Sequence, residues 1–134
     1  MMTEKTKFAV EPRKNATLVQ VTIAAGDALS GAADLTGGAV YYVIGPSDWT
    51  ADPNNPLNVG QQVFVSFQVS YDNISYFDLF DSNGYEVTRI IAPGAAVAID
   101  AALTAAAMYL KIRAGSRTNL VTQEADRTFT LMML

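Results

Sequence analysis

The side chains that most enzymes use for proton transfer and nucleophilic attack are scarce in this chain. Its 134 residues include no histidine and no cysteine, which removes the commonest general base, the commonest metal ligand and any thiolate nucleophile. Serine hydroxyls therefore have no imidazole to activate them, and Lys111 is the only lysine after position 15. We expect Lys111 and Arg113 to share the solvated outer face of a strand, where neither acts as a catalytic base.

Five acidic residues are the remaining candidates for a catalytic pair: Asp72, Asp78, Asp81, Glu86 and Asp100. Glycoside hydrolysis needs two converging carboxylates, but Asp78 alternates with apolar neighbours in a strand. We expect the Asp81 side chain to cap the turn at Asn83-Gly84. The segment from Asp81 lacks the acidic residue that an EF-hand loop needs two positions earlier. The sequence therefore predicts no enzyme, no cofactor and no metal site, with a small glycan-active enzyme or another kind of calcium site as minor alternatives.

Trp49 is the only tryptophan, and it lies in a proline- and asparagine-rich loop from Ser47 to Gly60. Loops of this length are usually functional or are packed by a partner. An exposed tryptophan there would stack on sugars. The interpretation that we favour is a plug over the end of the core, next to Pro46 and Pro53.

The charge balance argues against nucleic acid as a partner. The net charge is −4 and the isoelectric point is about 4.6, so a phosphate backbone should be repelled. The one basic cluster is N-terminal, and we expect it to contact an acidic partner or nothing at all, with DNA as a minor alternative: Lys5, Lys7, Arg13 and Lys14. Only 16% of the residues are charged, below the usual quarter, as in proteins whose surface is partly covered by neighbours.

No segment reads as a signal peptide or a membrane span. The first apolar stretch is only Phe8-Ala9-Val10, too short for the core of a signal peptide. The most apolar window, Ala95 to Leu110, is interrupted by Asp100 and falls short of the roughly 20 residues that a spanning helix needs. We expect no membrane association, and synthesis in a cytoplasm.

Short strand patterns recur along the whole chain. Gln62 to Ser70 alternates most clearly, with Val63, Val65, Phe67 and Val69 on one face. Seven further segments have strand composition: 17–24, 40–44, 76–80, 85–91, 95–99, 108–113 and 127–134. About eight strands at this spacing predict an all-β, antiparallel β-sandwich of the jelly-roll kind over residues 16–134, preceded by an N-terminal arm over residues 1–15.

Turn signals separate these strands. Asn83-Gly84 favours a two-residue type I′ hairpin, which requires positive φ at both residues. Asp72-Asn73 and Pro93-Gly94 predict two more tight turns. The alanine-rich segment 100–107 has helix propensity and is expected to make one or two helical turns.

Several blocks of the sequence resemble one family when taken together and in order. They are VTIAAG at 21–26 with LSGAADL at 29–35, IGPSDWTA at 44–51, VSFQVSYDN at 65–73 with YFDLFD at 76–81 and GYEV at 84–87, YLKIRAG at 109–115, and QEADRTFTL at 123–131. This pattern is similar to that of small virion structural proteins of tailed phages and gene-transfer-agent-like particles. The chain departs from it at Asp72-Asn73, where the family has Asp-Gly, and after Trp49, where Asp-Pro-Asn-Asn-Pro lengthens the loop.

The resemblance implies a structural role and brings no catalytic residues. Members look like capsid decoration (cement) proteins, or bases of head spikes and fibres. The first hypothesis is a homotrimer on the capsid exterior that bridges major capsid subunits. The alternative is a spike, fibre-base or tail module that binds a fibre protein or a glycan through Trp49 or a pair such as Tyr41-Tyr42. The residues expected to contact partners lie in the arm and the long loop: Lys5, Lys7, Phe8, Val10, Arg13, Trp49, Pro53, Asn54, Asn55 and Pro56.

Overall fold

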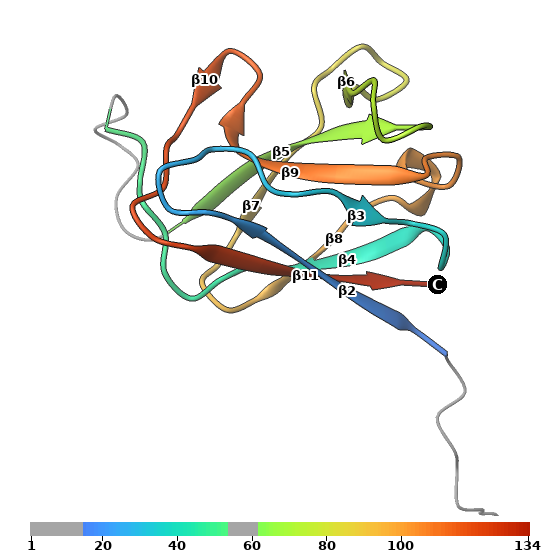
Figure 1. The fold of residues 1–134 in the computed structure, drawn as a ribbon, viewed down its shortest axis with the longest axis horizontal. Helices are drawn as coiled ribbons and strands as arrows, with labels where there is room; N and C mark the ends of the chain where they lie inside the picture. Colours follow the sequence, from blue (N-terminus) through green and yellow to red (C-terminus); the bar gives the residue numbers. More distant parts are fainter. Residues whose placement is uncertain (1–14, 54–61) are drawn as a thin grey trace, which may run out of the picture.

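The computed structural model describes residues 15–53 and 62–134, which form two facing antiparallel β-sheets (Figure 1). The first, here the small sheet, has the strand order β2 (Thr17–Ile23), β11 (Arg127–Met133), β4 (Val40–Ile44) and β8 (Ala96–Ala98). The large sheet runs β10 (Asn119–Leu120), β9 (Tyr109–Ser116), β5 (Val63–Ser70) and β6 (Phe77–Asp78). Two further strands extend it: β3 (Ala33–Asp34) pairs with β9, and β7 (Thr88–Ile91) pairs with β5.

The core lies between the sheets and follows the predicted alternation. Val63, Val65 and Phe67 of β5 are completely buried, and they face β11, which contributes Phe129, Leu131 and Met133. Apolar side chains from both inner faces thus fill one continuous core. The burial of this apolar area is the main force that holds the sandwich together.

The all-β sandwich prediction is confirmed, and so are the eight predicted strand segments. The structure adds two strands of only two residues, β3 and β10, which are too short for a pattern to reveal. The predicted jelly-roll connection stays a prediction. The predicted helical segment forms a single 3₁₀ turn at Ala101–Leu103, where the side chain of Asp100 accepts a hydrogen bond from the Ala102 amide at 3.1 Å.

The predicted type I′ turn at Asn83-Gly84 is wrong, although the chain reverses there. Gly84 has φ +82°, whereas Asn83 does not adopt positive φ. The Gly84 amide donates to the Asp81 carbonyl and the Asp81 amide to the Tyr85 carbonyl. This is the three-residue hairpin loop in which glycine takes the left-handed position. The Asp81 carboxylate accepts from the amides of Asn83 and Tyr85, so the predicted cap is confirmed.

The other two predicted turns are present. Asn73 has φ +62°, and the Asp72 carboxylate accepts hydrogen bonds from the amides of Ile74 and Ser75. These bonds hold the pKa of Asp72 below its ordinary value. At the Pro93-Gly94 turn the Ala95 amide donates to Ala92, and the chain passes from β7 in the large sheet to β8 in the small one.

Candidate functional site

The outer face of the large sheet carries a buried arginine network. Arg113 of β9 donates to Ser66 at 2.9 Å, to Asp78 at 2.6 Å and to Glu86 at 2.9 Å, and its side chain is 5% exposed. Arg117 adds a second ion pair to Asp78 at 3.1 Å and remains about half exposed. The prediction that Arg113 lies on a solvated face is therefore wrong, because carboxylates from two distant segments cover it.

This network is arranged for structure more than for acid–base chemistry. The hydrogen bond from Arg113 holds the pKa of Asp78 below its ordinary value, so this carboxyl is unsuited to donate a proton near neutral pH. Glu86 accepts from both Arg113 and the Arg117 amide. Two of the five acidic candidates for a catalytic pair are thus engaged by the same guanidinium. A shallow groove of about 630 Å³ borders the network and includes Lys111, whose ammonium lies 4.3 Å from the Tyr76 ring centre.

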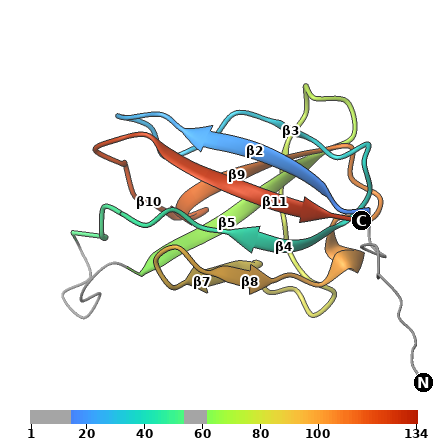
Figure 2. The same ribbon diagram turned by 90° about the horizontal axis from the view of Figure 1, so that it is seen from below.

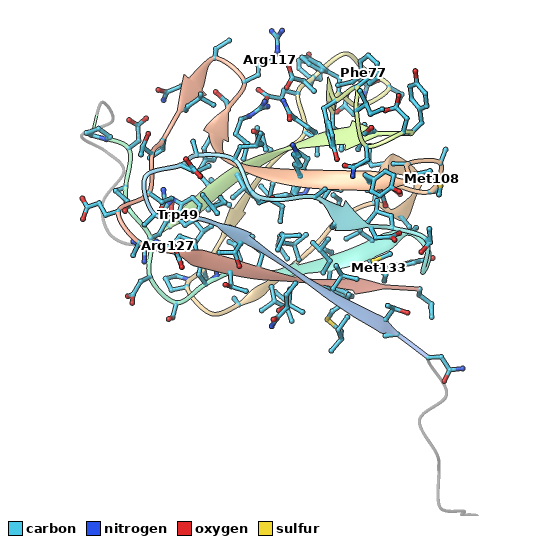
Figure 3. All side chains as sticks on the ribbon, in the orientation of Figure 1. Trp49, Phe77, Met108, Arg117, Arg127 and Met133 are labelled. Carbon is cyan, nitrogen blue, oxygen red and sulfur yellow. The ribbon has the colours of Figure 1, made fainter. Side chains whose placement is uncertain are left out.

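Trp49 is a plug over one end of the core, as the favoured interpretation predicted. It is 6% exposed, and its ring packs edge-on against Phe129 with 5.8 Å between centroids. The next residue, Thr50, exchanges two hydrogen bonds with the buried side chain of Gln123, which also accepts from Arg127. Figure 3 shows Trp49 and Arg127 side by side at this end of the sandwich. Trp49 is therefore not available for sugar stacking or for direct contact with a partner.

The outer face of the small sheet carries no charged side chain. Alternation and strand register place ten residues on it, none of them buried: Leu18, Gln20, Thr22, Tyr42, Ile44, Ala96, Ala98, Thr128, Thr130 and Met132. We call this surface the uncharged face, and Figure 2 looks onto it from below. Across the sheet, Leu18, Met132, Tyr42 and Ala98 form one apolar row. The next row pairs Gln20 with Thr130, and on the row beyond it the hydroxyls of Thr22 and Thr128 lie 2.9 Å apart.

A β-bulge widens the apolar end of this face. Met132 pairs with Tyr42 and Met133 with Val40, so Tyr41 is an extra residue in β4. Such a bulge turns both of its residues toward the same side of the sheet, and Tyr41 and Tyr42 are 43% and 46% exposed. They line a groove of about 240 Å³ with Ala16, Met132, Met133 and Leu134. We call it the tyrosine groove, and it has the exposed tyrosine pair that the glycan alternative requires.

A second apolar surface surrounds the turn between β5 and β6. Tyr71 and Phe77 stack with 6.4 Å between ring centroids and 13° between planes, and both rings are more than half exposed. Ile74, at the tip of the turn, is 84% exposed. A groove of about 250 Å³ runs from this pair to the 3₁₀ turn and the alanines that follow it, with Ala102, Leu103, Ala106 and Ala107 in its wall. We call Tyr71, Ile74 and Phe77 the aromatic turn; Figure 1 shows β6 at the end of the molecule away from the small sheet.

The predicted contact residues are only partly within the described chain. Trp49 is buried and Pro53 is exposed. The remaining predicted contacts lie outside the described residues: Lys5, Lys7, Phe8, Val10, Arg13, Asn54, Asn55 and Pro56. The uncharged face and the aromatic turn were not predicted as sites. An absence of Lys, Arg, Asp and Glu at every second position of β2, β4, β8 and β11 was the signal that could have revealed the face.

The part of the chain that the structure describes contains neither a metal-binding cluster nor a membrane-spanning helix. Within residues 15–53 and 62–134, no group of three or more acidic residues could hold a metal ion. No helix in that part of the chain is long and apolar enough to cross a membrane. Comparisons of the chain with protein-family models, with curated proteins and with solved structures found no match.

Proposed function

We propose that this protein is a structural component of a bacteriophage virion, a decoration protein that binds the outside of the capsid and bridges major capsid subunits. The observation that supports it is the pair of surfaces with exposed apolar side chains on one sandwich, the uncharged face and the aromatic turn. A protein that links neighbours needs two separate contact surfaces held at a fixed distance. The resemblance of the sequence blocks to virion structural proteins points in the same direction.

The chemistry of these surfaces suits burial in an assembly. Desolvating a charged side chain is costly unless it finds a partner, whereas alanine loses little on contact and a threonine or tyrosine hydroxyl needs only a hydrogen-bond partner. Exposed aromatic and methionine side chains are enriched at the cores of protein interfaces. In this proposal the aromatic turn contacts the capsid and the uncharged face joins copies of the protein, as a trimer at a local three-fold position. Many equivalent contacts around a capsid make modest affinity at each one sufficient.

A second candidate function is a glycan-binding or fibre-base module on a head spike or tail. The tyrosine groove favours it, because two half-exposed tyrosine side chains combine ring surfaces for stacking with hydroxyl groups for hydrogen bonding. A glycan array with the wild-type protein tests it. Retention that is lost on Tyr42→Ala would support this reading over the decoration role.

Sedimentation with capsids that lack this protein tests the decoration role. We expect the wild type to bind saturably and Ile74→Glu to bind at least tenfold more weakly, since the new charge lies at the tip of the aromatic turn. Ser82→Glu places the same charge on the next exposed turn and serves as the matched control. Unchanged binding by Ile74→Glu would remove the aromatic turn from the interface, and no binding by the wild type would reject the decoration role.

A further inference from the structure

The tyrosine groove lies where the described chain begins. Ala16, directly before β2, forms part of its wall, so the preceding segment, residues 1–14, is attached at its rim. That segment contains a single apolar triplet, Phe8-Ala9-Val10, between charged residues. A groove of about 240 Å³ holds one aromatic ring comfortably, since a cavity of about 150 Å³ is sufficient for benzene.

The lining of the groove matches a phenyl ring. Tyr41 and Tyr42 offer aromatic faces and edges, which favour offset or edge-to-face contact with another ring. Met132 adds a thioether, and sulfur–aromatic contacts are favourable. Within the described residues none of the groove's side chains carries a charge, so an apolar side chain that enters displaces no water from a charged side chain.

Charge complementarity favours this segment as the occupant. Residues 1–14 contain four basic residues and two acidic ones, Glu4 and Glu11, and so carry a net charge of +2. Because the whole chain carries a net charge of −4, the remaining 120 residues carry −6. Two sandwiches of charge −6 repel each other. A basic segment that lies on the sandwich of another copy reduces that repulsion.

The area of the uncharged face favours a second copy over the segment's own sandwich. Four strands about 4.8 Å apart and about six residues long cover roughly 400 Å², whereas a stable interface buries about 800 Å² per partner. Residues 1–14 of a neighbour would supply the missing area and bring that neighbour against the face. Phe8 lies seven residues before Asn15, so it reaches up to about 25 Å from the start of the described chain when this segment is extended, which is enough to cross to a copy packed against this edge of the sandwich.

We propose that the tyrosine groove of each copy receives Phe8 and its flanking residues from a second copy of this chain. Exchange of this kind in one direction closes into a ring when the rotation between successive copies closes, as it does in a trimer. The inference rests on the proposed function in one respect, namely that copies of the protein assemble side by side. It identifies what covers the uncharged face and leaves the aromatic turn free for the capsid.

Photo-crosslinking of the full chain tests the exchange. We would place p-benzoylphenylalanine at position 8, mix equal amounts of ¹⁵N-labelled and unlabelled protein, irradiate, and map the crosslinks by mass spectrometry. We expect crosslinks to Met132 or Tyr42, with mixed-isotope pairs as about half of the total, and far fewer from the same probe at position 3. Crosslinks confined to one isotope, or to residues of the large sheet, or none at all, would overturn the proposal.

Self-association gives an independent readout. We expect Phe8→Ala to weaken assembly at least tenfold in sedimentation equilibrium, and Thr130→Glu at the centre of the face at least a hundredfold. Thr6→Ala and Thr118→Glu are the matched controls, and unfolding curves identify any loss of fold. Unchanged association of both test variants would refute the exchange. If the protein binds capsids although association is unchanged in both variants, the exchange is refuted and the decoration role stands. If copies assemble through the groove but bind no capsid, the decoration role is refuted and the exchange stands.

Discussion

Replacement of Arg113 by methionine removes the hub of the network on the large sheet. Arg113→Met keeps much of the aliphatic length and deletes three donors at 2.6 to 2.9 Å. It leaves the fully buried Ser66 without its guanidinium partner, and it leaves Asp78 and Glu86 facing each other without their shared cation. Both carboxylates lose a charge-assisted hydrogen bond, which is the strong kind.

The expected cost follows from burial. Removing one partner of a buried ion pair costs about 3–5 kcal/mol. The side chains of Asp78 and Glu86 are 26% and 16% exposed, so water offsets part of the lost interaction. We therefore expect the free energy of unfolding to fall by about 3 kcal/mol. In a domain of this length each 1 kcal/mol lowers the Tm by roughly 4 °C, so the Tm should fall by about 12 °C.

Urea and thermal unfolding of the full chain at pH 7 measure this difference. Arg117→Met is the matched control, because the Arg117 side chain is 48% exposed and makes one ion pair; its loss should cost less than about 1 kcal/mol. An Arg113→Met protein within 1 kcal/mol of the wild type would refute the reasoning.

The pH dependence gives the same account a second test. Arg113 holds the pKa of Asp78 below its ordinary value of 3.8, so this stabilisation is present above about pH 3.8 and disappears as the pH falls through the lower, folded-state pKa. In Arg113→Met the pKa of Asp78 should rise. The stability difference between wild type and variant should therefore be largest near neutral pH and narrow below about pH 3.8. A difference that stays constant down to pH 2.5 would contradict this cause.

Four further substitutions test the account of the fold by unfolding measurements. Trp49→Ala should cost about 3–4 kcal/mol by opening a cavity over Phe129, and a cost below 1 kcal/mol would contradict the plug. Gln123→Ala should cost about 2 kcal/mol, because the Thr50 amide and carbonyl lose their buried partners. Gly115→Ala should lower the free energy of unfolding by more than about 2 kcal/mol, since Gly115 has φ +89° and an added Cβ would collide with the Asn119 carbonyl oxygen. An unchanged stability would contradict this geometry of the turn between β9 and β10. Asp81→Ala should cost about 1 kcal/mol through loss of its two turn hydrogen bonds.

The sequence predicted the strands well because their signal is local. Alternation in β5 identified its buried face, and turn residues marked where the chain reverses. The plug at Trp49 was also predictable, since a lone tryptophan between prolines has few other places in a small sandwich. The type of the Asn83-Gly84 turn was missed because the Asp81 side chain holds both the Asn83 and Tyr85 amides, which favours the looser loop.

The candidate sites depend on pairings that no local pattern contains. The sequence of its own strand predicts a solvated Arg113. The side chain is buried because Asp78 and Glu86, which lie 35 and 27 residues away in the sequence, bind it. The uncharged face exists only because β2, β11, β4 and β8 are neighbours, an order that joins the two ends of the chain. The bulge at Tyr41 depends on the register between β4 and β11. These long-range features are what a single sequence conceals.

Imaging of capsids incubated with the purified full-length protein tests the central claim most directly. We expect saturable density at junctions between capsomers, where side-by-side copies touch the shell through the aromatic turn. We also expect the decorated capsid to resist heat or low salt better than the bare one. Bare capsomer junctions, with density only at a vertex or tail, would contradict the decoration role and support the spike or fibre-base alternative.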